Sequence, residues 1–228
     1  CFNYFKDRLA RFYGTVVNLA IANDWMHKNP FAGIRFQEKE VIREVLTKEE
    51  IERMMCKEFA LPRLEYVRDV FIFCVFTGMA YVDVNNLRQE HIARDNNDDL
   101  WIRKARQKTN NMCNIPLLKI PQLLMEKYKN HPLCTKTGAL LPVPSNQKMN
   151  SYLKEIADFC GIQKNLTTHT ARHTFATVVA LANGVSMENI AKMLGHSDIR
   201  MTQRYAKVMD SSIMRDMENV DKLFKSSE

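Results

Sequence analysis

The stretch from Leu100 to Ile115 reads LWIRKARQKTNNMCNI and holds two strand-like runs on either side of a polar turn. The runs are Leu100 to Ala105 and Met112 to Ile115, and the turn residues Thr109-Asn110-Asn111 separate them. A further turn, Asp95-Asn96-Asn97-Asp98, lies just upstream. Short runs bounded by Asn and Asp clusters are typical of antiparallel strands. We therefore expect a small antiparallel sheet between His91 and Pro116.

Helical patterns dominate on both sides of this sheet. Apolar residues recur at three- and four-residue steps from about Tyr4 to Met26 and again from about Pro62 to Phe76. Thr47-Lys48-Glu49-Glu50 has the pattern of a capping box, which begins a helix. After Leu117 we expect only helices, with stops at Gly161, Gly184 and Gly195. The fold class is therefore mainly α (α+β), with a small antiparallel sheet.

Composition narrows the class of protein. The 228 residues carry 33 Lys+Arg and 26 Asp+Glu, a net charge of +7, and 46% are hydrophobic. This is the composition of a folded globular domain, and the basic balance is compatible with a nucleic-acid partner. The longest apolar run, Val70 to Phe76, is too short to cross a membrane. The six cysteines form no close pair, which favours a reduced, cytoplasmic compartment and gives no metal-binding spacing.

The chain divides by pattern into three parts. Residues 1–33 form one helical unit that ends near Asn29-Pro30, and residues 34–46 are charged and aperiodic like a linker. Residues 47–228 form the main domain, which ends in an apolar stripe over about 211–224. That last stripe packs either on its own domain or on a neighbouring molecule. The chain begins with Cys1, so we expect it to be a fragment or a processed product.

Two short motifs contain histidines. His169 and Arg172 lie three residues apart at the start of an expected helix and so share a face. A helix N-terminus is also where an anion docks. His196 follows in Leu194-Gly195-His196-Ser197, after a helix that Gly195 ends. Taken singly, each motif is more simply read as a helix cap with exposed side chains.

Two further residues complete a constellation. Tyr205 lies nine residues after His196, and Lys108 lies at the bend of the expected hairpin. A lone tyrosine on an amphipathic helix is usually half-buried core, and a turn lysine is usually solvated. In this order and spacing, however, the four features are specific.

Together they resemble the tyrosine recombinase (phage integrase) family over nearly the whole chain. Phe76-Thr77-Gly78-Met79-Ala80-Tyr81-Val82-Asp83-Val84-Asn85-Asn86-Leu87 matches the family's first catalytic box. Residues 1–33 look like the end of its helical core-binding domain, which clamps DNA. The resemblance implies a helical catalytic domain of tyrosine-recombinase type over residues 47–228.

The resemblance implies phosphoryl transfer with neither a metal nor any other cofactor. Tyr205 would attack a phosphodiester of duplex DNA, forming a 3′-phosphotyrosine and a free 5′-hydroxyl. A second DNA end would then reverse this step. Arg172 would hold the non-bridging oxygens. His169 would assist by hydrogen bonding or proton transfer, and His196 would hydrogen-bond the phosphate. Lys108 would protonate the leaving oxygen.

One position departs from the family pattern. Ala80 stands where the family has its first catalytic arginine, and losing one such donor costs about 10²–10³ in rate. Residues two apart on a strand share a face, so Arg106 and Lys104 should point the same way as Lys108. We expect either that Arg106 replaces the missing arginine or that it only binds the DNA backbone. Asp83 would orient the active-site groups. The Ala80 pattern resembles integrases of conjugative transposons of the Bacteroidetes type.

The expected partner is double-stranded DNA bearing recombination sites, used for integration or excision of a mobile element. Residues 101–119 contain five cations and no acid. The resemblance implies a homotetramer on two synapsed duplexes, a monomer or dimer off DNA, no membrane, and a cytoplasmic, nucleoid-associated place in a bacterium. Accessory DNA-bending proteins are a further class of partner that it admits. The expected DNA-contacting residues are Arg103, Lys104, Arg106, Lys108, His173 and Arg204.

Two alternatives remain open. A type IB topoisomerase shares these residues and would relax plasmids without site preference. A DNA-binding regulator that has lost catalysis would explain Ala80, but it would not explain why five other site residues are retained. A metal-dependent nuclease has little support, because Asp83 and Asp198 lie in different segments.

Overall fold

The computed structural model describes residues 13–31 and 44–206. The chain divides into two units, Cys1–Ile42 and Arg43–Glu228. Within the first unit the described helix covers residues 13–22, inside the helical region expected from about Tyr4 to Met26. Residues 1–12 and the apolar stripe expected at 211–224 lie outside the described residues. The division at residues 33 and 46 stays a prediction.

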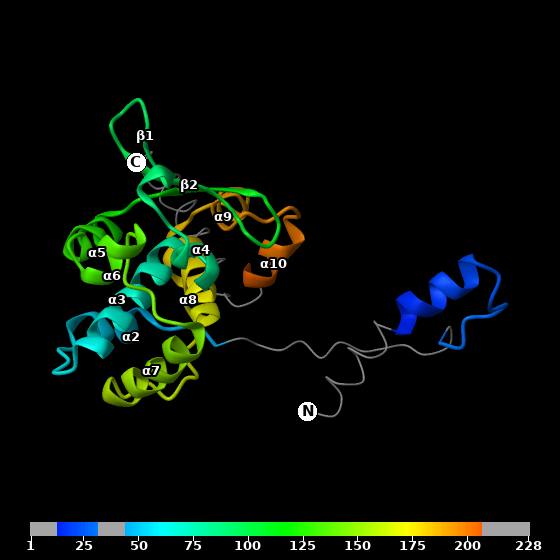
Figure 1. Ribbon diagram of the computed structural model, residues 1–228, viewed down its shortest axis with the longest axis horizontal. Coiled ribbons are helices and arrows are strands. Elements are labelled where there is room, and N and C mark those ends of the chain that lie inside the picture. The colour runs from blue at the N-terminus through cyan, green and yellow to red at the C-terminus, as the bar shows by residue number, and fades with distance from the viewer. Residues whose placement is uncertain (1–12, 32–43, 207–228) are drawn as a thin grey trace, which may run out of the picture. The chain divides into compact units, whose positions relative to one another are not determined.

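Helix α3 (Pro62–Thr77) is the centre of the second unit. Pro62 occupies its first turn, and Gly78 ends it in the left-handed conformation with φ 67°. The helix is buried on every side and contacts α2 (Lys48–Cys56), α5 (Lys119–Tyr128), α7 (Asn146–Phe159) and α8 (Thr168–Thr174) (Figure 1). It therefore supplies the core against which the other helices are placed.

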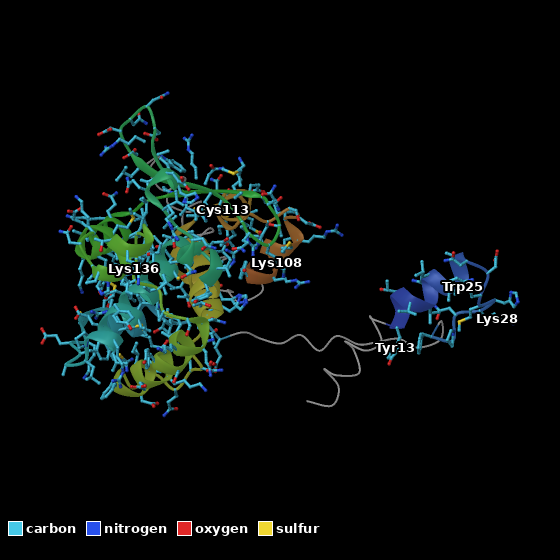
Figure 2. The ribbon with its side chains drawn as sticks, in the orientation of Figure 1. Tyr13, Trp25, Lys28, Lys108, Cys113 and Lys136 are labelled. Carbon is cyan, nitrogen blue, oxygen red and sulfur yellow. The ribbon has the colours of Figure 1, made fainter. Side chains whose placement is uncertain are left out.

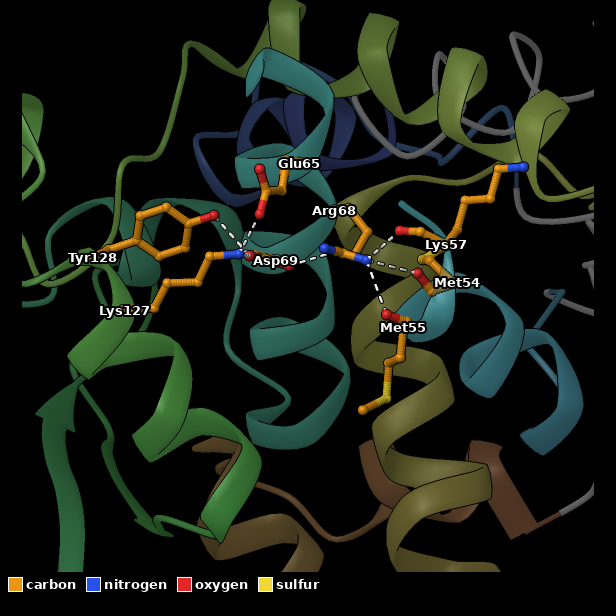
Figure 3. Close-up of polar contacts among 8 residues, drawn as sticks. All are labelled: Met54, Met55, Lys57, Glu65, Arg68, Asp69, Lys127 and Tyr128. Carbon is orange, nitrogen blue, oxygen red and sulfur yellow. Dashed lines mark hydrogen bonds and ion pairs between the residues drawn. The ribbon is translucent and has the colours of Figure 1, made fainter. Parts of the chain in front are cut away.

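A buried ionic cluster joins α3 to two of these helices (Figure 3). Arg68 donates from Nη1 to three backbone carbonyls at the end of α2. Asp69 accepts hydrogen bonds from two residues of α5, from Nζ of Lys127 at 2.7 Å and from Oη of Tyr128 at 2.7 Å. Arg68 and Asp69 also bond to each other. The cluster satisfies charges that burial would otherwise make costly. The carbonyls are those of Met54, Met55 and Lys57.

The sheet has three antiparallel strands in the order β1 (Ile92–Arg94), β2 (Leu100–Ala105) and β3 (Met112–Pro116). The expected hairpin is β2–β3, with Ile102 opposite Ile115 on the buried face. Strand β1, which pairs with β2, is the strand that the sequence pattern did not resolve. The prediction of a mainly helical fold with a small antiparallel sheet is confirmed.

The remaining elements are short. Short helix α4 (Tyr81–Asn85) follows Gly78, and the 3-10 turn η1 (Gln89–His91) leads into β1. The π-helical segment η2 (Phe175–Ala180) and the 3-10 turn η3 (Leu181–Asn183) follow α8 and precede α9 (Met187–Leu194) and α10 (Arg200–Ala206). Helix α6 (Pro132–Thr137) follows α5. A second, smaller core cluster joins η2, α9 and α10 and includes Tyr205.

Several helices begin or end where short sequence motifs predicted it. Thr47 and Glu50 form the expected capping box at the start of α2. Gly161, Gly184 and Gly195 all have positive φ at the ends of helical segments, as expected. None of the described helices combines the length and the apolar character that crossing a membrane requires.

Candidate active site

Arg172 is the most buried cation of the site. It projects from α8, and 6% of its surface is exposed. Its Nη1 donates to the carbonyl of Gly78 at 2.6 Å, and its Nη2 donates to the carbonyl of Leu194 at 2.6 Å. These carbonyls lie at the C-terminal ends of α3 and α9, where the helix dipoles favour a cation. Burial, followed by the charge of Arg106, lowers the pKa of Arg172, yet an arginine stays protonated. Because its hydrogen bonds go to neutral carbonyls, its charge remains available to an anion.

His196 lies against this guanidinium. Its Nε2 is 3.3 Å from Nη2 of Arg172, and its Nδ1 is 2.8 Å from Oγ1 of Thr202. Burial lowers its pKa to about 4, and the charges of Arg172 and Arg106 act in the same direction. His196 is therefore a neutral imidazole at neutral pH.

Tyr205 is placed by α10 beside two histidines. Its ring stacks on that of His196, with centroids 6.3 Å apart and an interplanar angle of 8°, and its centroid is 5.2 Å from that of His173. Only 8% of its surface is exposed, because it also packs into the cluster formed by η2 and α9. Tyr205 is therefore buried more completely than the half-buried position that is usual for a lone tyrosine on an amphipathic helix.

Arg106 enters the same site from the end of β2. Its Nε lies 4.0 Å from Oδ2 of Asp83 on α4, and this buried nitrogen has no hydrogen-bond partner. The aliphatic part of the side chain packs on Gly195, where an added Cβ would lie 2.8 Å from Cδ of Arg106. Its charge lowers the pKa values of Arg172 and of His196. Arg106 is therefore a second cation next to both groups.

Asp83 holds the hairpin as well as facing Arg106. Its Oδ1 accepts a hydrogen bond from the backbone N–H of Gln107 at 3.0 Å, and Asn86 donates to the side chain of Gln107 at 2.9 Å. On the other side of the bend, Asn111 donates to the carbonyl of Gly195 at 3.3 Å. Helix α4 and the loop after α9 thus fix both ends of the bend that carries Lys108.

Lys108 and His169 are not gathered into this buried group. Lys108 is exposed at the hairpin bend, whereas Cys113 on β3 is buried; both are labelled in Figure 2. His169 is exposed at the start of α8 and lines a shallow pocket of about 270 Å³ together with His173. His173 thereby connects the pocket of His169 to the ring of Tyr205.

Lys104, Arg106 and Lys108, which were expected to share one face, have different surroundings, and only Lys104 lies within β2. Lys104 lies on the same side of the strand as Arg106, yet its Nζ is 3.1 Å from Nε2 of His91. Arg103 on the opposite side is exposed, as is Arg204 on α10. Over residues 13–31 and 44–206, no three or more His, Cys, Asp or Glu side chains are grouped to hold a metal ion.

Sequence reasoning missed three contributors to the site. Thr202 bonds to His196, and the carbonyls of Gly78 and Leu194 bind Arg172. For Thr202 a signal existed, since it lies three residues before Tyr205 and hence one helical turn away. The identity of the side chains does not reveal which backbone carbonyls will bind Arg172.

Known proteins resemble this chain in sequence and in fold. The model of the phage integrase family matches residues 44–212. The tyrosine recombinase XerD of Staphylococcus saprophyticus is 40% identical over 95 residues, which is 42% of this chain and 31% of the relative. XerD of Staphylococcus aureus is 42% identical over 71 residues, 31% of this chain and 24% of the relative. The matched region thus spans about a third of these relatives or less.

Solved structures share the fold at lower identity. A Tn1549 transposon integrase, in complex with circular intermediate DNA, superposes with a TM-score of 0.67 at 17% identity, covering 92% of this chain and 77% of that one. The lambda integrase dimer bound to a core site superposes with a TM-score of 0.64 at 18% identity, covering 83% of this chain and 68% of that one. The XerA recombinase superposes with a TM-score of 0.60 at 23% identity, covering 80% of this chain and 66% of that one. The family match covers most of the chain, and the chain therefore belongs to the phage integrase family.

Proposed function

We propose that this chain is a site-specific DNA recombinase that cuts and rejoins duplex DNA through a 3′-phosphotyrosine at Tyr205. The observation that carries the proposal is the convergence of Arg172, His196 and Tyr205, with Arg106 beside them. Two cations and a neutral imidazole next to a phenol suit attack on a phosphodiester, whose transition state spreads negative charge over the phosphoryl oxygens. The named relatives are recombinases, which supports the same substrate class.

The reaction needs no external energy source in this scheme. As the phenol oxygen of Tyr205 forms a bond to phosphorus, its proton passes to His169 or to water. The bond from phosphorus to the 5′-oxygen breaks, and Lys108 supplies the proton that the leaving oxygen takes. A 5′-hydroxyl from another strand then attacks phosphorus and releases the phenol. The number of phosphodiester-type bonds is unchanged at each step, so no ATP is required.

Covalent capture on nicked duplexes tests the proposal without a known cognate site. The 228-residue chain is incubated with a pool of duplexes that have a randomised core and a nick placed so that the cut fragment diffuses away. We expect a protein–DNA adduct that survives denaturation and that Tyr205→Phe abolishes. The captured DNA should be enriched in particular core sequences. DNA binding without any adduct would contradict catalysis and favour the regulator. An adduct without enriched sequence would favour the topoisomerase.

We further propose that Arg106 supplies the charge that the family's first arginine supplies elsewhere. Its support is the contact with Asp83 on α4, the helix that starts directly after Ala80, and its charge coupling to Arg172. Arg106→Ala should lower the rate of adduct formation about 10²–10³-fold. Arg103→Ala removes the same charge from the exposed side of the same strand, so it measures how much of any loss comes from weaker DNA binding alone. A near wild-type rate for Arg106→Ala, with DNA binding intact, would contradict this role.

Lys108 has a test of its own because its role is proton donation. Lys108→Ala should cut ordinary DNA slowly. The variant should regain its rate on DNA whose leaving 5′-oxygen is replaced by sulfur, because a thiolate leaves without a proton. If sulfur substitution restores nothing, Lys108 acts by binding and not as the acid.

The assembly is proposed from the family resemblance and from charge. Residues 1–33 would close a clamp on duplex DNA, and four protomers would join two duplexes, with the stripe at 211–224 docking on a neighbour. Cross-linking on captured adducts should then give tetramers that a chain ending at residue 210 does not form. Equal tetramer yields would place that stripe on its own domain. Integration or excision of a mobile element of the Bacteroidetes type is the cellular role that we propose.

A further inference from the structure

His91 is a half-buried histidine that has no part in the reaction proposed above. It is the last residue of the 3-10 turn η1, and 19% of its side chain is exposed. Its Nδ1 accepts a hydrogen bond from the backbone N–H of Arg88 at 2.9 Å. A backbone N–H can only donate, so Nδ1 presents its lone pair, and the proton of the neutral ring is on Nε2. Nε2 of His91 is therefore a hydrogen-bond donor.

A second donor faces this nitrogen. Nζ of Lys104 on β2 lies 3.1 Å from Nε2 of His91, and a lysine ammonium also has donors but no acceptor. The two groups therefore cannot satisfy each other. Glu90 does not separate them, because its Oε1 is 3.8 Å from Nε2, too far for a hydrogen bond. Among the residues that the structure describes, Lys104 forms no ion pair with a carboxylate.

The charges around this pair favour an anion. Burial and the charge of Lys104 lower the pKa of His91, so the ring stays neutral at neutral pH. The guanidinium of Arg88 is also near and donates to two backbone carbonyls, which leave its charge uncompensated. The side chain of Glu90 is 77% exposed and so extends mainly into solvent. An anion that contacts both Nζ of Lys104 and Nε2 of His91 would accept hydrogen bonds from two donors that otherwise oppose each other.

The pair lies next to the candidate active site. Lys104 precedes Arg106 by two residues, a distance of about 6–7 Å along an extended chain. An anion between Lys104 and His91 is therefore not the one that Arg106 and Arg172 face. Each strand of duplex DNA carries a phosphate about every 3.4 Å along the helix axis, so a surface that holds one phosphate lies close to others.

We propose that His91 and Lys104 form a second phosphate-binding site, which takes a phosphate of the DNA backbone that is not the one being cut. Lys104 supplies the charge, and Nε2–H of His91 supplies a neutral hydrogen bond. Lys104 was an expected DNA contact, whereas His91 was not. The site rests on the proposed function in taking duplex DNA as the partner. Phosphate contacts carry no base information, so the pair fixes where the duplex lies on the catalytic unit and not which sequence is cut.

Binding to a fluorescent duplex of arbitrary sequence tests the charge. The affinity of the 228-residue chain is measured by fluorescence anisotropy over a range of salt concentrations at neutral pH. Lys104→Ala should weaken binding about tenfold and reduce the slope of log affinity against log salt by about 0.9, the value for one phosphate contact. Lys136→Ala is the matched control, because it removes the same charge from an exposed lysine on α6 and should leave the slope unchanged (Figure 2).

His91→Asn tests the neutral donor. The Oδ1 of asparagine can still accept the N–H of Arg88, but the side chain is too short to replace Nε2. We expect binding to weaken several-fold with an unchanged salt slope, because the lost contact carries no charge. Urea unfolding should show wild-type stability. In the variant that combines His91→Asn with Lys104→Ala, the loss should be smaller than the product of the two single losses, because both groups hold the same phosphate.

The outcomes separate the possible failures. An unchanged slope in Lys104→Ala would overturn the site and identify Lys104 as a neutral amine that accepts the proton of Nε2. Independent effects of the two variants would also overturn it, since they would then contact different groups. If the slopes change as expected but no adduct forms, the proposed function fails and the phosphate site stands. If adducts form while both variants bind like the wild type, the site fails and the function stands.

Discussion

Gly195 offers a quantitative test of how the site is packed. It ends α9 with φ 61°, and an added Cβ would lie 2.7 Å from Sγ of Cys113 and 2.8 Å from Cδ of Arg106. Gly195→Ala would therefore incur two costs. The left-handed backbone costs an alanine about 1–2 kcal/mol, and overpacking a filled interior costs about 1–3 kcal/mol. We expect the free energy of unfolding to fall by about 2–5 kcal/mol.

Gly184 separates these two costs. It also has positive φ, at 82°, but an added Cβ there meets nothing within 4 Å. Gly184→Ala should therefore lose only the backbone term of about 1–2 kcal/mol. The effect of alanine on the unfolded chain is common to both variants and cancels in the comparison.

Urea unfolding followed by circular dichroism measures both variants. We expect Gly195→Ala to be less stable than Gly184→Ala by about 1–3 kcal/mol, the overpacking term alone. Gly195→Ala should also displace Arg106 and slow adduct formation, which Gly184→Ala should not. Equal losses of stability in the two variants would refute the close packing of Arg106 on Gly195.

Three further outcomes follow from burial and charge. The pKa of His196 is about 4 in the fold against 6.5 for the free side chain, so the unfolded chain binds the proton first as pH falls. Stability should thus decline between pH 6.5 and about 4, and a His196→Asn variant should decline less in urea titrations over that window. Asp69→Ala should cost about 3–5 kcal/mol, because Arg68 then lacks its carboxylate. Tyr128→Phe removes one of the hydrogen bonds to Asp69 and should cost about 1.5–3 kcal/mol in the same unfolding assay.

What the sequence predicted well is local. The capping box at Thr47, the glycine stops and the β2–β3 hairpin depend on residues close together in the chain, and each is present in the structure. The phage integrase family was also identified from short motifs and is confirmed by the family match. Alternation along β2 predicted that Arg106 points the same way as Lys108. The structure places the charge of Arg106 close enough to act on Arg172, whereas Lys108 is exposed at the bend.

What escaped prediction depends on contacts between distant segments. Strand β1 is three residues long and takes its form from pairing with β2. An adjacent turn brings Nε2 of His91 within 3.1 Å of Nζ of Lys104, a contact that was not predicted, and the expected DNA contact of Lys104 stays a prediction. His173 was expected at the DNA surface, and packing of α10 brings its ring beside that of Tyr205. No pattern in the sequence encodes which helix end supplies carbonyls to Arg172.

Those carbonyls have an evolutionary consequence. Gly78 and Leu194 bind Arg172 through main-chain atoms, which no amino-acid replacement can delete. Side chains around the guanidinium of Arg172 can therefore diverge as long as the ends of α3 and α9 keep their positions. Selection should then act most strongly on the glycines that end α3 and α9, and a lineage could exchange neighbouring cations, such as an arginine at position 80, without rebuilding the pocket.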